Sequence, residues 1–506
     1  MTKYIQRLIS LYCILMLAVM PLYFHDGYND ILDAKAFMVW AISLVMLLLI
    51  SPALIKRSAE YTRKKTEKGS TVLSLLDISV LVFGGCALIS SIASEWRLES
   101  FTGEEAWYVG SLLIAMLVVW YFIISRYASA GRLYLAMFFA SIAVIMILAL
   151  LNDMNRDPAE LLRSDLAVYW RDSFSSTIGN VDVFAGYLSI VIPFLTMLFI
   201  NIKQPFLKVF SAVVLFLCFT AMYMTHADGV YLGVAAGMAF VVWYAMRDSG
   251  RFLMLLVSGV IFGLAGYGTM LLSRLFPEVS FELISPVLLG HRVYFYAGIA
   301  SFVMILIHMA LEQKVKKEKI DRALQKLSLV YLIGLIVAIA CAAIYLVGVF
   351  EPEIFNRRGV IWDICIKVFR RGDIKEYLLG LGTACIDLDA RSFSSVILEY
   401  YGAIYDIDTA HNEILEYLVC TGIPGCAAYL MIFAVPLVSV IRGAYEKKSI
   451  SKIDEQAYFM AGIAGYFGQG LMYGPHPLNF AILMVLLGLF RSVELRERVG
   501  KKPVAS

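Results

Sequence analysis

One histidine stands where a helix is expected to begin, and this position gives it a possible chemistry. The stretch Thr409-Ala410-His411-Asn412-Glu413 leads directly into a long apolar segment. Asn412 is a good helix N-cap, which places His411 just ahead of the first turn. The positive end of a helix disfavours imidazolium, so we expect the His411 ring to be neutral. A neutral imidazole is a competent general base. The alternative is an interfacial histidine with no chemical role.

Arginines upstream of His411 are candidate ligands for an anion. Arg357 and Arg358 lie together in a polar stretch, and Arg292 precedes another apolar segment. A guanidinium group binds phosphate oxygens through paired, charge-assisted hydrogen bonds. Arg357 and Arg292 each have an alternative interpretation without a binding role. Arg357 also fits a solvated loop charge. Arg292 also fits a side chain that reaches from a helix end to the membrane surface.

The elements that must position these residues are membrane helices. Of the 506 residues, 60% are hydrophobic and only 16% are charged, and the mean hydropathy is +0.76. No water-soluble fold hides so much apolar surface, so lipid is the solvent for most of the chain. The apolar stretches recur at lengths of about 20 residues without strict alternation, which indicates helices and not barrel strands.

We predict an all-α polytopic membrane protein with about 14 transmembrane helices, within a range of 12 to 14. The first 20 residues are interpreted as a span and not as a signal peptide, because no small-residue cleavage site follows them. The predicted spans cover residues 5–24, 34–54, 75–93, 109–125, 132–151, 182–200, 206–224, 229–246, 252–272, 292–311, 328–349, 414–440, 456–473 and 477–491.

The distribution of basic residues predicts the orientation. With the N-terminus inside, about 29 of the 43 Lys and Arg fall on inside segments, as the positive-inside rule requires. We therefore expect a multi-pass protein of the plasma (inner) membrane with both termini in the cytoplasm. The predicted parts are N-terminal helices in 1–178, central helices in 179–349, one large extracytoplasmic loop in 350–413, and C-terminal helices with a cytoplasmic tail in 414–506.

Local patterns predict three features around the large loop. The apolar positions of Val360–Phe369 fit a helix lying flat on the membrane surface. Leu379-Gly380-Leu381-Gly382 is typical of a flexible turn, and Gly422-Ile423-Pro424-Gly425 predicts a kink in the next helix. Cys365 and Cys385 are the two cysteines of this loop and one option is a disulfide between them. No CxxC spacing and no phosphate-binding glycine loop occurs, which gives no support for zinc or nucleotide chemistry.

Aromatic residues and a second histidine mark other predicted outer borders. Trp96, Trp107, Tyr108 and Trp170 are best interpreted as an interfacial aromatic belt, with sugar stacking as the alternative. His476, between Pro475 and Pro477, is interpreted as part of a rigid structural turn.

Three separated stretches resemble the superfamily of O-antigen ligases and O-antigen polymerases. The region from Ala410 to Gly425 resembles its His-Asn-x-x-Leu motif with a Gly-x-x-Gly a few residues on. Arg358-Gly359-Val360-Ile361-Trp362, followed by Gly380-Leu381-Gly382, resembles an Arg, a Trp four positions on, and a Gly-x-Gly turn. Gly179-Asn180-Val181-Asp182 is similar to the Gly-Asn-x-Asn start of a family span. The resemblance covers about residues 179–490.

This resemblance implies a GT-C-like membrane glycosyltransferase acting on the outer face of the plasma membrane. His411 would take a proton from an acceptor hydroxyl, and Arg358 would bind the diphosphate of an undecaprenyl-diphosphate-linked glycan, with Asn412 in the same site. The acceptor would be a glycan, a lipid or a protein, and the sequence does not separate ligase from polymerase. The reaction would be inverting and independent of metal or cofactor. Membrane lipids are the other expected partners, and no nucleic acid is expected as a partner.

One stretch departs from the family pattern. Many members carry Ser-Arg-Gly at the outer end of a middle span, where this chain has His226-Ala227-Asp228-Gly229. A carboxylate therefore stands where a second diphosphate ligand is expected. The candidates to replace that arginine are Arg292, Arg357 and Arg171, in this order. Asp228 itself is a candidate to orient a base or to meet the acceptor.

Two alternatives of other classes stay open. A transporter or flippase of a lipid-linked saccharide would usually show repeats and charges near the middle of its spans, and neither is apparent in the sequence. A non-catalytic relative is suggested by the missing arginine, while the retained His411-Asn412 pair argues against it.

Overall fold

The computed structural model describes residues 2–63, 73–105, 107–129, 131–162, 173–277, 279, 284–348, 351, 354–402, 407–446 and 450–498. In this part of the chain the only strands are β1 (Phe174–Ser175) and β2 (Gly179–Asn180), which form one antiparallel hairpin. Everything else that is regular is helical. The prediction of an all-α membrane protein is confirmed at this level.

Eleven helical segments among the described residues are long and apolar enough to cross a bilayer. The first joins α1 (Thr2–Ile14) to α2 (Met20–Leu22) through one π-helical turn, Leu15–Val19. The other ten are α3 (Ile31–Arg63), α4 (Leu75–Ala93), α7 (Arg132–Asp153), α8 (Val181–Asn201), α9 (Pro205–Met224), α11 (Ser249–Leu275), α13 (Val293–Lys314), α14 (Lys317–Gly348), α19 (Glu413–Tyr445) and α21 (Pro477–Arg498).

The remaining predicted spans also coincide with helices. α6 (Ser111–Tyr127) and α10 (Gly229–Ala245) are apolar but only 17 residues long. α20 (Ile450–Gly470) is less apolar, because its first turns carry Lys452, Asp454 and Glu455. Each predicted span is thus a helix, and the count of about 14 crossings stays a prediction.

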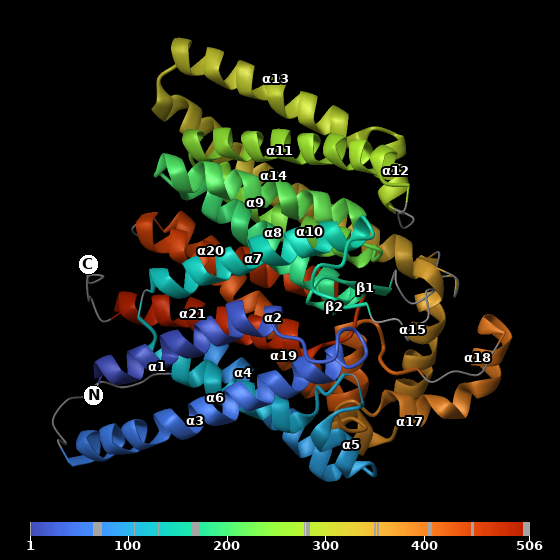
Figure 1. The fold of residues 1–506 in the computed structure, drawn as a ribbon. Coiled ribbons are helices and arrows are strands. Elements are labelled where there is room, and N and C mark those ends of the chain that lie inside the picture. The colour runs from blue at the N-terminus through green and yellow to red at the C-terminus, as the bar shows by residue number, and fades with distance from the viewer. Residues whose placement is uncertain are drawn as a thin grey trace.

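The helices form a bundle with two different ends. In Figure 1 the long helices lie side by side, with the start of α1 and the end of α21 at the left. The short helices α5 (Arg97–Thr102), α17 (Ile386–Ala390) and α18 (Ser394–Tyr401) lie at the right, beside α15 (Ile354–Arg371). Both ends of the described chain therefore lie opposite the segment 350–413.

The centre of the bundle is α8, which packs against α10 and α20 and is almost entirely buried. Glycines permit this close approach. A Cβ added to Gly233 of α10 would lie 2.2 Å from Ser189 Oγ, and one added to Gly465 of α20 would lie 1.8 Å from Ser189 O. Small residues at such contacts let helix backbones approach in a membrane, where packing drives association. The position of α8 is consequently fixed by its neighbours.

The amphipathic stretch of the large loop forms α15, but its apolar face does not lie on the membrane. Ile361, Ile364, Cys365 and Val368 are buried in a small core shared with α17, α18 and the first turns of α19. The prediction of a helix lying flat on lipid is wrong, because an apolar stripe marks a buried face without saying what covers it. Cys365 and Cys385 are both free thiols, so no disulfide joins them.

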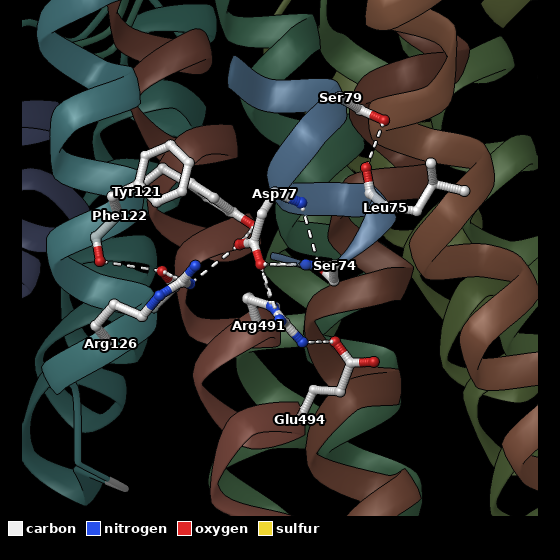
Figure 2. A network of polar contacts seen from close by, with 10 residues as sticks. Ser74, Leu75, Asp77, Ser79, Tyr121, Phe122, Arg126, Arg491 and Glu494 are labelled. Carbon is white, nitrogen blue, oxygen red and sulfur yellow. Dashed lines mark hydrogen bonds and ion pairs between the residues drawn. The ribbon is translucent and has the colours of Figure 1, made fainter. Parts of the chain in front are cut away.

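A buried ionic network ties three helices together near the opposite end of the bundle (Figure 2). Asp77 of α4 accepts hydrogen bonds from Arg126 of α6 at 3.0 Å and from Arg491 of α21 at 2.8 and 3.1 Å. Tyr121 donates to the same carboxylate at 2.9 Å, and Glu494 binds the far side of Arg491. The side chains of Asp77 and Arg491 are fully buried, so their charges are compensated within the network.

We expect Asp77→Ala to lower the free energy of unfolding by about 3–5 kcal/mol, because it removes the carboxylate that pairs with the buried Arg491 and the partly buried Arg126. Unfolding in mixed detergent micelles measures this. Ser79→Ala is the matched control, since Ser79 only donates to Leu75 O of its own helix. Equal unfolding midpoints for the two variants would show that the network is not a structural lock.

Candidate functional site

The start of α19 is fixed by Asn412, as the sequence predicts. Its Oδ1 accepts the backbone N–H groups of Ile414 at 3.0 Å and Leu415 at 3.1 Å. Its Nδ2 donates to Leu471 O at 3.0 Å. Glu416 Oε2 accepts the N–H of Ala410 at 2.8 Å, which fixes the chain on the other side of His411. The amide of Asn412 is thus engaged through both of its polar atoms, which places this residue as a positioning group.

His411 has an unusual backbone conformation, and one nitrogen of its ring lacks a hydrogen-bond partner. Its φ is +45°, in the left-handed region that few non-glycine residues adopt. The side chain is 21% exposed, with Nε2 lying 3.6 Å from Asp408 Oδ1. Nδ1 is buried and has no hydrogen-bond partner among the described residues. The ring lies 5.6 Å from that of Tyr473.

The His411 imidazole is neutral, and burial is the main reason. Burial and the positive charge of Arg358 together lower the pKa of His411 to about 3, and burial is the larger of the two causes. The helix dipole was the cause expected from sequence, whereas desolvation of the charged ring is the larger effect here. The contact with Asp408 is therefore one between a neutral imidazole and a carboxyl group, and not an ion pair.

Arg358 of α15 lies in the same site as His411. Its positive charge lowers the pKa of His411. The same charge opposes the rise that burial causes in the pKa of Asp228 and of Tyr473. Its Nη2 is 3.5 Å from Asp182 Oδ1, which is a long contact that leaves most of the guanidinium donors unused by this carboxylate. A series of contacts through Asp182, Asn180 and Tyr473 links Arg358 to His411.

A kink in α19 receives the glycine turn of the large loop. Gly422 has a φ of +69°, and Pro424 lacks the N–H that would bind Cys420 O, so the helix opens there as predicted. The freed Cys420 O accepts the N–H of Gly382 at 3.1 Å, and Val419 O accepts that of Leu381 at 3.0 Å. The turn that the sequence presents as flexible is therefore anchored, and it connects the segment of Arg358 to the helix of His411.

The third sequence stretch completes the same site. Asn180 caps α8 by accepting the N–H groups of Asp182 at 2.8 Å and Val183 at 3.3 Å. Tyr473, in the turn between α20 and α21, donates its hydroxyl to Asn180 Oδ1 at 3.2 Å. Since Tyr473 also packs on the ring of His411, the start of α8 is linked to the start of α19.

A tryptophan and an acidic residue beside His411 were missed as site residues. Trp107 Nε1 donates to Asp408 Oδ2 at 2.8 Å, and its ring packs against that of Tyr473 at 5.1 Å. Trp107 is 8% exposed, so it is part of the site and not of a lipid-facing belt. A cavity of about 20 Å³, close to the space of one water, lies beside Trp107 and Asp408. Its lining includes the buried Glu416.

Two of the three arginines expected to act in place of an arginine at position 228 lie in the described part of the chain. Arg357 is exposed and adjoins Arg358 in the chain. Arg292 is exposed between α12 (Ile284–Gly290) and α13, and its side chain has no hydrogen bond or ion pair within the described residues. Arg171 lies outside the described residues. Asp228 accepts the N–H of Ile284 at 3.1 Å, and burial raises its pKa.

His476 occupies a rigid turn, in agreement with its sequence interpretation. It is 1% exposed, its Nδ1 accepts the N–H of Leu478 at 3.3 Å, and burial lowers its pKa to about 3. Its ring lies 6.2 Å from that of Trp107, so this turn packs against a residue of the site. Across the described ranges, no group of three or more His, Cys, Asp or Glu side chains is arranged to hold a metal ion.

Comparisons with family models, with curated proteins and with solved structures found no match to this chain.

The anchored kink gives a test of how the site is built. We expect Gly422→Ala to lower the free energy of unfolding by about 1–3 kcal/mol, because alanine is strained at this φ. In addition, its Cβ would lie 2.7 Å from the carbonyl carbon of Leu378. Gly85→Ala in α4 is the control, since nothing lies within 4 Å of its added Cβ. Detergent unfolding of both variants decides this, and equal stability would mean that the kink tolerates a side chain.

Proposed function

We propose that this protein is a membrane glycosyltransferase that moves a glycan from an undecaprenyl-diphosphate carrier to an acceptor hydroxyl on the outer face of the plasma membrane. The observation that carries the proposal is the meeting of a neutral His411, with Nδ1 unpartnered, and the cationic Arg358. A base beside an anion ligand is the pair of groups that displacement of a diphosphate requires. The same pair supports ligase and polymerase chemistry equally.

The proposed reaction is a direct displacement at the anomeric carbon. The acceptor oxygen forms a bond to that carbon while the bond from carbon to the diphosphate oxygen breaks, which inverts the configuration. The acceptor proton goes to Nδ1 of His411, and the electron pair leaves with the lipid diphosphate. Arg358 stabilises the negative charge that develops on the leaving group, through two N–H donors directed at its oxygens.

The low pKa of His411 has a consequence for this reaction. An imidazole with a pKa of about 3 is a weak base near neutral pH. A bound diphosphate would offset the charge of Arg358 and bring negative charge to the site, and both effects raise the pKa of His411. The base would then become stronger only when the donor is in place.

A transporter of lipid-linked saccharide is the alternative from another class. It has no need for a neutral imidazole held at the end of a span by a cap, a buried carboxyl group and an aromatic ring. A non-catalytic relative would keep the fold without needing His411 itself. Both alternatives predict that the wild-type protein itself transfers no glycan to any acceptor.

We expect His411→Gln to reduce transfer by about 100-fold or more, since it removes the base while keeping a polar side chain. The measurement is surface glycan formation in a strain lacking its own copy of the protein, at equal membrane expression. His291→Gln, at an exposed position outside the site, is the matched control. Full transfer by His411→Gln would refute the base assignment, and failure of wild type with every acceptor would favour the transporter or the non-catalytic relative.

The pH dependence of transfer tests the link between donor and base. Since kcat/KM reports the free enzyme and kcat the donor complex, we expect the acid limb of kcat to lie at higher pH than that of kcat/KM. Arg358→Gln should move the acid limb of kcat/KM upward, because removing a nearby positive charge raises the pKa of His411. Arg371→Gln, in the same helix but paired with Asp389, is the control. Coincident limbs in wild type would contradict the link.

A further inference from the structure

Asp408 contacts a different residue through each of its carboxyl oxygens, which the sequence does not suggest. One carboxyl oxygen, Oδ2, accepts the indole N–H of Trp107 at 2.8 Å. The other, Oδ1, faces Nε2 of His411 at 3.6 Å. Trp107 is itself fixed by edge contacts with Tyr473 and His476. The carboxyl group therefore has one oxygen anchored and one directed at the imidazole.

A neutral imidazole carries its proton on one nitrogen, and the partner of the other nitrogen decides which. A carboxylate can only accept a hydrogen bond, so it favours a proton on the nitrogen that faces it. Nε2 faces Asp408, whereas Nδ1 faces no partner among the described residues. We propose that Asp408, anchored by Trp107, is a positioning residue that keeps the proton of His411 on Nε2 and leaves the lone pair of Nδ1 for the acceptor hydroxyl.

This inference deepens the proposed function and, for its role in transfer, rests on it. The groups around the His411 ring come from two further elements and from its own segment. They are Arg358 of α15, Tyr473 of the turn before α21, and Asp408 itself from the chain before α19. Of these, Arg358 has no acceptor atom and the Tyr473 hydroxyl donates to Asn180. Asp408 is thus the group here that is suited to accept a proton-bearing ring nitrogen.

The gap of 3.6 Å between Asp408 and His411 fits a contact that tightens when substrate arrives. It exceeds a normal N–H···O hydrogen bond by more than half an ångström. Contacts between catalytic groups are often long without substrate and shorten in the complex. When Nδ1 takes the acceptor proton, the ring becomes a cation, and a carboxylate at Nε2 then stabilises it. Asp408 would therefore contribute more in the transition state than in the resting enzyme.

The tautomer of His411 is the direct test, and it needs no substrate. The full chain, labelled with ¹⁵N at its six histidines and reconstituted in lipid nanodiscs at pH 7, gives imidazole nitrogen shifts that separate the two tautomers. Comparison with His411→Gln identifies its signals. We expect a protonated Nε2 and an unprotonated Nδ1 in wild type, and a mixture of tautomers in Asp408→Asn. A protonated Nδ1 in wild type, or an unchanged tautomer in Asp408→Asn, would overturn the proposal.

Transfer kinetics in membrane vesicles, with the donor concentration varied, give the second readout. We expect Asp408→Asn to lower kcat by about 10²–10⁴-fold with little change in KM, as is typical when the carboxylate partner of a catalytic histidine is lost. Trp107→Phe should fall between wild type and Asp408→Asn, because it removes the N–H anchor but keeps an aromatic ring. Asp389→Asn and Trp243→Phe are the matched controls, since Asp389 pairs with Arg371 and Trp243 lies in α10 away from the site.

These results separate failure of the inference from failure of the proposed function. If wild type shows no transfer but the tautomer responds to Asp408→Asn, the positioning role holds and the glycosyltransferase proposal fails. If transfer depends on His411 but Asp408→Asn transfers at the wild-type rate with an unchanged tautomer, the glycosyltransferase proposal holds and the role of Asp408 is refuted.

Discussion

The candidate site depends on two backbone carbonyls, those of Val419 and Cys420, that the kink in α19 leaves to other donors. Pro424 has no N–H to offer Cys420 O. Gly422, with a φ of +69°, interrupts the regular helix within α19. An unpaired carbonyl at this depth is costly unless it finds a donor. Here the donors are the N–H groups of Leu381 and Gly382, together with the hydroxyl of Ser90, which binds Cys420 O at 2.6 Å. The large loop is thus attached to the bundle through bonds that α19 itself cannot satisfy.

This attachment explains how a loop can present an arginine at a defined place. α15 and α17 pack their apolar residues on the first turns of α19, in a core that includes Val419 and Cys420. The carbonyls of these same two residues receive the glycine turn. Packing and hydrogen bonding therefore act on the same short piece of α19, which follows His411 in the chain. Packing and hydrogen bonding together attach this part of the loop to the bundle, as a site made from distant segments requires.

The sequence predicted features that depend on short-range physics. Hydropathy located the helices, since burial in lipid follows from apolar length alone. Asn412 as a cap and Gly422 with Pro424 as a kink were confirmed, because their partners lie within a few residues. The lipid-facing position of α15 was wrong, since amphipathicity does not distinguish lipid from protein as the cover. Asp408, Trp107 and Tyr473 could not be found as a group, because about 300 residues separate Trp107 from Asp408 in the chain.

The charge balance of the site argues for a role of protons in binding as well as in chemistry. Arg358 is accompanied by two acidic residues, Asp182 and Asp228, and by a neutral His411. A lipid diphosphate entering this site would meet carboxylates as well as a guanidinium group. Burial already raises the pKa of Asp228, and a nearby diphosphate would raise it further. A protonated Asp228 donates a hydrogen bond to a phosphate oxygen instead of repelling it. Under the proposed function, the carboxyl group that stands in place of the family arginine would therefore become a ligand by taking up a proton as the donor binds.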